Sequence, residues 1–120
     1  DAVIFATGLE VNEALQAAKL LEEDGIQVKV VNIHTIKPID EELIISSAKE
    51  CGKVITVEEH SVIGGLGSAV CDVLAENYPV PVKKIGVNDT FGESGPALEL
   101  IKKFELDGES IYRKVKEFLA

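Results

Sequence analysis

The sequence predicts an α/β fold of three layers, in which a parallel sheet of four strands is covered by helices on both faces. Short apolar runs alternate with segments of helical periodicity along the whole chain, as in folds built from β-α-β units. The first two runs are almost continuously apolar, which is typical of strands buried on both faces of a parallel sheet. No repeat or linker divides the 120 residues, so we expect one domain over residues 1–120.

The chain opens with the pattern of a strand, a helix and a second strand. The run Ala2–Thr7 is apolar and ends at Gly8, which predicts a buried strand. Apolar residues then recur at helical spacing over Glu10–Asp24, and Gly25 stands where a helix C-cap belongs. The apolar run Val28–Ile33 predicts the second strand.

The next helix and strand have clear boundary signals. Pro38 interrupts the chain because proline disfavours the helical conformation of the residue before it. Asp40 is a good N-cap for a helix over Glu41–Glu50, and Gly52 closes that helix. The third strand is expected over Lys53–Glu58.

The last third of the chain predicts one more strand and three helices. A helix is expected over Leu66–Asn77, followed by the fourth strand over Val82–Val87. Two helices are predicted to close the chain, over Pro96–Phe104 and Ser110–Leu119, and Asp107 is placed to cap the second of them.

We expect the strand order 2-1-3-4, and right-handed crossovers then decide which face of the sheet each connecting helix covers. The helix over Glu10–Asp24 is then expected on one face, together with the two C-terminal helices. The helices over Glu41–Glu50 and Leu66–Asn77 are expected on the other face. The strand Val28–Ile33 would lie at an edge of the sheet.

The composition argues against two kinds of partner. A formal net charge of -9 repels phosphate backbones, so we expect no nucleic acid, and no run approaches the ~20 apolar residues that a membrane helix needs. Cys51 and Cys71 form no C-x-x-C motif, and we expect buried thiols in a cytoplasmic protein. Because Asp1 is not a methionine and leads directly into a strand, we expect a piece of a longer protein.

The stretch TVEEHSVIGGLGSAV, Thr56–Val70, is consistent with a phosphate loop, an acid/base site or an interface. A dinucleotide fingerprint needs G-x-G-x-x-G directly after a strand. Here Val70 stands in place of the third glycine, and six residues separate the strand from the first glycine. Glu58 and Glu59 alternate in direction on a strand, so only one can face a given pocket. His34 and His60 lack the spacing of metal ligands. We therefore favour an architectural and interface role.

Four segments in this order and spacing resemble a known family: IFATGLEV, IHTIKPID, TVEEHSVIGGLGSAV and FGESG. Together they are similar to the C-terminal domain of transketolases, most of all to the split type made of two subunits. The resemblance extends to 1-deoxyxylulose-5-phosphate synthases and to the beta subunits of 2-oxoacid dehydrogenases. Relatives of those kinds often carry arginine at the position of His34 or glycine at that of His60, so both residues favour transketolase.

The resemblance implies an enzyme that uses thiamine diphosphate and a divalent cation such as Mg²⁺ to transfer two-carbon ketol units between sugar phosphates. In this family the cofactor lies between two other domains at a dimer interface, and no catalytic, cofactor-binding or metal-binding residue maps onto this chain. The implied partners are the remaining transketolase domains or an N-terminal subunit, within a homo-oligomer. The family also adds an antiparallel strand beside Val28–Ile33 from residues upstream. A free-standing regulatory module, binding a small molecule at the carboxyl ends of the strands, is the alternative.

We expect the interface or crevice to be formed by residues of the first and third strand ends and of the glycine-rich loop. At least one of Glu58 and Glu59 should accept hydrogen bonds from backbone amides, for example at a helix N-terminus. The glycines should bring the next helix close to the sheet. The full set is Thr7, Gly8, Glu58, Glu59, His60, Val62, Ile63, Gly64, Gly65 and Gly67.

Overall fold

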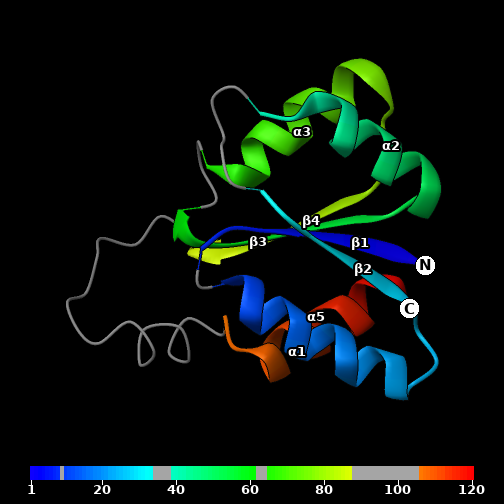
Figure 1. Cartoon of the computed structure of the whole chain (residues 1–120), viewed down its shortest axis with the longest axis vertical. Helices are drawn as coiled ribbons and strands as arrows, with labels where there is room; N and C mark the ends of the chain where they lie inside the picture. Colours follow the sequence, from blue (N-terminus) through cyan, green and yellow to red (C-terminus); the bar gives the residue numbers. More distant parts are fainter. Residues whose placement is uncertain (9, 34–38, 62–64, 88–105) are drawn as a thin grey trace.

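The computed structural model of the chain describes residues 1–8, 10–33, 39–61, 65–87 and 106–120; the side chains of residues 59–61 and 87 lie outside that description. Strands and helices alternate as expected (Figure 1). The strands are β1 (Ala2–Ala6), β2 (Val28–Asn32), β3 (Val54–Ser61) and β4 (Val82–Val87). The helices are α1 (Glu10–Glu23), α2 (Glu41–Cys51), α3 (Leu66–Asn77) and α5 (Gly108–Leu119). The helix predicted over Pro96–Phe104 falls outside the described residues.

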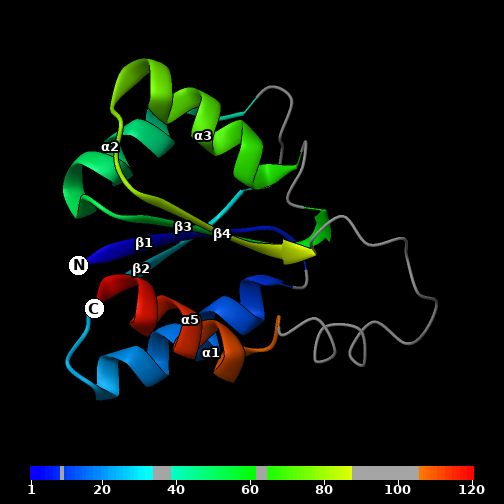
Figure 2. The same cartoon turned by 180° about the vertical axis from the view of Figure 1, so that it is seen from behind.

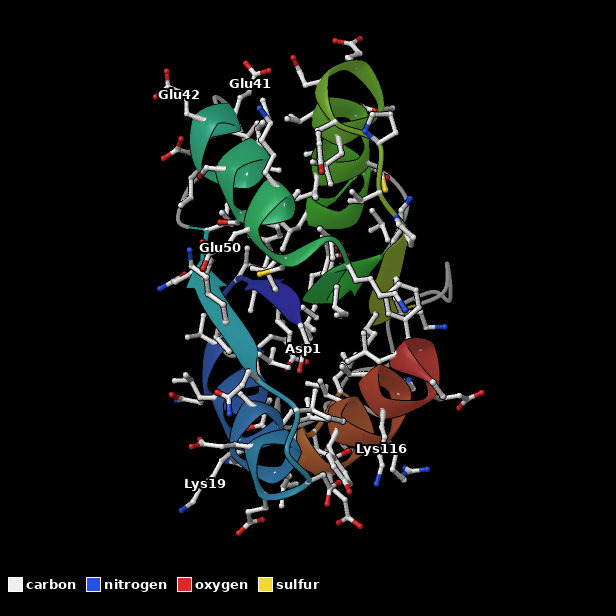
Figure 3. All side chains as sticks on the ribbon, turned by 90° about the vertical axis from the view of Figure 1, so that its right-hand side faces the viewer. Asp1, Lys19, Glu41, Glu42, Glu50 and Lys116 are labelled. Carbon is white, nitrogen blue, oxygen red and sulfur yellow. The ribbon has the colours of Figure 1, made fainter. Side chains whose placement is uncertain are left out.

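The strands form one parallel sheet in the order β2-β1-β3-β4, which confirms the prediction. Helices α2 and α3 cover one face and α1 and α5 cover the other (Figures 1 and 2). This is the division of helices that right-handed crossovers predict. The view onto the amino ends of the strands shows the sheet between the two helical layers (Figure 3).

The core has two halves, because successive side chains of a strand point to opposite faces. In β1, Ala2, Ile4 and Ala6 pack with α1 and α5, whereas Val3 and Phe5 pack with α2 and α3. All five side chains are fully buried. Burying a side chain the size of Ile4 or Phe5 contributes about 1.5–3 kcal/mol to stability.

The predicted helix caps are confirmed. The Asp40 side chain accepts a hydrogen bond from the Leu43 N–H at 3.1 Å, and Asp107 accepts one from the Ser110 N–H at 3.3 Å. Gly52 ends α2 with φ of 79°, a left-handed conformation in which its N–H donates to Ala48. These local signals are readable from sequence because each involves residues only a few positions apart.

Two predictions need correction. Strand β3 is longer than Lys53–Glu58, because pairing with β4 resumes at Ser61 and Val87 after an irregular register beyond Val57. Cys51 and Cys71 are free thiols, as expected, but both are half-buried rather than buried. Cys51 is the last residue of α2 and lines a groove at the amino ends of the strands, which leaves its thiol partly accessible. Within the described residues, no helix is long and apolar enough to cross a membrane.

Candidate functional site at the carboxyl end of the sheet

The first part of the candidate site is the turn that leaves β1. The carbonyl oxygen of Thr7 accepts a hydrogen bond from the Glu10 N–H at 3.1 Å, and that of Gly8 accepts one from Val11 at 3.3 Å. Gly8 has φ of 57°, in the left-handed region that favours glycine. Thr7 is half-buried and Gly8 is exposed. The turn therefore starts α1 directly at the carboxyl end of β1.

The second part is Glu58 on β3, the strand next to β1. Its side chain is 1% exposed, and its two oxygens accept hydrogen bonds from the Leu66 and Gly67 N–H groups, each at 2.8 Å. These are the first two residues of α3, whose N–H groups have no acceptor within the helix. The expectation that one of the two adjacent glutamates caps a helix N-terminus is thus confirmed for Glu58.

The third part is the contact between the first turn of α3 and the sheet. A Cβ atom added to Gly67 would lie 2.9 Å from Thr56 Oγ1 and 3.0 Å from Lys84 Cγ. Real Cβ atoms do not approach other atoms so closely, so a glycine is needed at this position. Gly65 is the N-cap residue of α3 and makes no side-chain cap hydrogen bond. The carboxylate of Glu58, eight residues before Leu66, takes the place of that cap.

For the remaining predicted residues, the structure describes either the backbone alone or no atoms. Glu59 and His60 belong to β3, which extends beyond the expected end at Glu58, and pairing with β4 resumes at Ser61. The side chains of Glu59 and His60 lie outside the description. Val62, Ile63 and Gly64 also lie outside the described residues, as does His34.

Sequence reasoning placed Thr56 in the third strand, but it gave no sign that Glu10 is buried. Glu10, the first residue of α1, is fully buried. Thr56 is fully buried, and its hydroxyl has no hydrogen-bond partner among the described residues. An acidic residue in a first helical turn was a visible signal for Glu10, because negative charge is favoured there. Its burial depends on packing between distant segments and left no signal in the sequence.

The described part of the site holds the start of α3 against the sheet. The buried carboxylate of Glu58 faces two backbone donors that cannot exchange protons with a substrate. The described residues contain no group of three or more His, Cys, Asp or Glu side chains that could hold a metal ion. A groove of about 600 Å³ lies at the opposite end of the strands, where Asp1, Lys53 and Ala120 line it.

Comparison with known proteins decides the family. Residues 1–111 match the family model described as "Transketolase, C-terminal domain". The chain belongs to this family. The resemblance seen in the sequence is thereby confirmed for nearly the whole chain.

Its curated relatives are subunits and longer enzymes. The chain is 52% identical over 118 residues to a putative transketolase C-terminal section of Methanocaldococcus jannaschii, covering 98% of this chain and 36% of that protein. It is 50% identical over 117 residues to a 6-deoxy-6-sulfo-D-fructose transketolase subunit of Clostridium sp. strain MSTE9, with the same coverage of 98% and 36%. A 1-deoxy-D-xylulose-5-phosphate synthase of Syntrophotalea carbinolica is 43% identical, and the chain covers 19% of it. The chain thus spans about a third of the first two relatives.

Solved structures agree on the fold. The structure described as "Split gene transketolase, inactive beta4 tetramer" is 50% identical, with a TM-score of 0.90 over 98% of this chain and 38% of that chain. A transketolase of Pichia stipitis is 28% identical, with a TM-score of 0.68 over 98% of this chain and 16% of that chain. The three-layer fold and the strand order 2-1-3-4 are those of the family.

Proposed function

We propose that this chain is a non-catalytic domain of a transketolase, in which it supports the assembly of the enzyme. The whole enzyme would transfer two-carbon ketol units between sugar phosphates with thiamine diphosphate and a divalent cation. The remaining transketolase domains, or a separate N-terminal subunit, would bind that cofactor and cation. The family membership and the split-type relatives support this proposal.

One observation carries the non-catalytic part of the proposal. Glu58, the best acid/base candidate whose side chain is described, is buried and uses both oxygens to hold the start of α3. A general acid or base must reach the reacting atom within hydrogen-bond distance or through one water molecule. A carboxylate enclosed between β3 and α3 does not meet that condition.

The proposed partners follow from the same reasoning. The carboxyl ends of β1 and β3 would face the cofactor-binding part of the enzyme, through the stretch that contains His60, Val62 and Ile63. The whole protein would be a cytoplasmic homo-oligomer; one similar protein is described as a tetramer, and the half-buried free thiols of Cys51 and Cys71 suit a reducing compartment.

Calorimetry on the isolated chain, with thiamine diphosphate and Mg²⁺, tests the division of labour. We expect no measurable binding to residues 1–120 and binding to the whole protein under the same conditions. A dissociation constant in the micromolar range for the isolated chain would contradict the proposal, since it corresponds to about -8 kcal/mol of specific contact.

Relatives at 40% identity or more include both transketolase subunits and 1-deoxy-D-xylulose-5-phosphate synthases, so synthase activity is the alternative to ketol transfer between sugar phosphates. Assays of the whole protein for ketol transfer and for formation of 1-deoxyxylulose 5-phosphate would separate these two activities. A saturable thermal shift of the isolated chain with sugar phosphates would instead favour the regulatory module.

A further inference from the structure

The amino end of α3 has the geometry of an anion-binding site. The consecutive N–H groups of Leu66 and Gly67 donate to the same carboxylate at 2.8 Å each, in a place that solvent does not reach. Such N–H groups attract negative charge because they lack acceptors within the helix and lie at the positive end of its dipole. We infer that this is an anion-binding site that the chain fills with its own Glu58 carboxylate, so that a small external carboxylate enters it only when that side chain is truncated.

A second, independent observation points to the same place. The hydroxyl of Thr56 is fully buried and has no hydrogen-bond partner in the described part of the chain. It stands 2.9 Å from the point where a Cβ atom of Gly67 would lie, so it abuts the first turn of α3. Thr56 and Glu58 both approach Gly67, so they lie on the face of the sheet that α3 covers. A hydroxyl that is unsatisfied within the described residues thus lies beside the two amides that already hold an anion.

The size of the site selects the ligand. The atoms that Glu58→Ala removes beyond Cβ are those of one acetate ion, and the two amide donors stay behind. Lys84 helps to close the site, because its Cγ and Cδ atoms lie 3.0 and 3.1 Å from the Cβ position of Gly67. Packed surroundings relax only partly around a truncated side chain, so a space of this shape remains. Acetate and formate fit the donors and the space.

This glycine-rich helix start is not a phosphate loop, because the chain's own carboxylate fills it. The two amides that a phosphate would need are satisfied within the chain, and Glu58 adds a negative charge that opposes a second anion. The wild-type domain therefore takes no sugar phosphate at this turn.

Thermal unfolding of Glu58→Ala in sodium acetate, with sodium chloride at the same ionic strength as reference, is the test. In chloride we expect the midpoint to fall by about 10 °C, because two buried charge-assisted hydrogen bonds are lost. In acetate we expect a saturable recovery with half-saturation on the order of 10 mM, and none for the wild type. Amide NMR signals of Leu66 and Gly67 should shift with acetate in the variant alone.

Two further variants serve as controls. Glu58→Gln keeps the volume of the side chain, so it should be destabilised without recovery in acetate. Asp40→Ala removes a carboxylate that accepts a single amide hydrogen bond at the exposed start of α2, so it should show no saturable recovery. If Glu58→Ala does not fold in chloride, we expect it to fold in acetate, and this result supports the inference in the same way as a recovery of the midpoint. Equal behaviour of Glu58→Ala in acetate and chloride, or a phosphate-induced shift of these amides in the wild type, would overturn the inference.

Discussion

Gly67 is the residue at which α3 comes closest to the sheet, and it sets the first prediction. An alanine Cβ would lie 2.9 Å from Thr56 Oγ1, and neither a buried strand residue nor the capped helix can move freely. We expect Gly67→Ala to lower the free energy of unfolding by about 1–3 kcal/mol, measured by urea denaturation. Thr56→Ala should reduce the cost of Gly67→Ala when the two are combined, since it removes the hydroxyl oxygen.

Gly25 offers a matched comparison for that variant. It has φ of 80° and nothing within 4 Å of an added Cβ, so Gly25→Ala tests backbone conformation without crowding and should cost about 1 kcal/mol. A value for Gly67→Ala near zero would show that the contact with Thr56 does not constrain the helix.

Sequence reasoning could assign the role of Glu58 but not the burial of Glu10. A carboxylate near a predicted helix start has a general reason to cap it, so the hydrogen bonds of Glu58 were predictable. The way the helices close over the sheet buries Glu10, and it leaves the Thr56 hydroxyl without a hydrogen-bond partner among the described residues. Such packing joins residues far apart in the sequence, and no local pattern encodes it.

At the scale of elements, the attachment of α5 to α1 gives a prediction on pH. Tyr112 and Lys116 of α5 donate hydrogen bonds to the carboxylate of Asp24, which follows α1, and these bonds lower the pKa of Asp24 from 3.8. A lowered pKa means that the ionised form stabilises the fold. That stabilisation is complete above about pH 4 and is lost as the pH falls through the lowered value.

We therefore expect the difference in stability between the wild type and Asp24→Asn to be constant from about pH 5 to 8 and to shrink below about pH 4. Urea denaturation across this range is the measurement. Glu23→Gln changes an exposed carboxylate one residue earlier and serves as control. A difference that stays constant down to pH 2 would show that the contact with Tyr112 and Lys116 does not favour ionised Asp24 in solution.

The elements themselves were largely predictable because their signals are local. Caps, glycines and prolines lie next to the boundaries that they define, and right-handed crossovers place the connecting helices on the two faces once the strand order is given. The length of β3 was not predictable, since the pairing of Ser61 with Val87 joins residues on two different strands. The polar residues after Val57 gave no sign of a strand, because the partner strand rather than local propensity extends β3.

At the scale of the whole molecule, the described helices share one direction relative to the sheet. All the described helices begin at the carboxyl end of the sheet, and acidic residues occupy the first turns of three of them: Glu10, Glu13, Glu41, Glu42 and Glu109. Lys49 and Lys116 lie in last turns, at the other end. Each of these side-chain charges has the sign that is favourable at its end of the helix dipole. Among the described residues, the first turns of these helices therefore place negative side-chain charge at the carboxyl end of the sheet.

The two edges of the sheet differ in how they are protected. Strand β4 carries two exposed lysines, Lys83 and Lys84, which deter pairing with another strand. On β2, Val28 and Val30 are half-buried, and Lys29 forms an ion pair with Glu50 at 3.6 Å. We therefore expect the β2 edge, rather than β4, to accept an antiparallel strand from upstream residues in the longer protein.

Amide hydrogen exchange tests this expectation residue by residue. The Ile33 N–H donates to the Ala6 carbonyl at 3.0 Å, and because N–H directions alternate along a strand, those of Val30 and Asn32 point to the open edge. In the isolated chain Val30 and Asn32 should exchange faster than Val31 and Ile33, and in the whole protein all of them should be protected. Sedimentation must accompany the measurement, since pairing of two copies through β2 would also protect the edge. Full protection of Val30 and Asn32 in a strictly monomeric isolated chain would contradict an open edge.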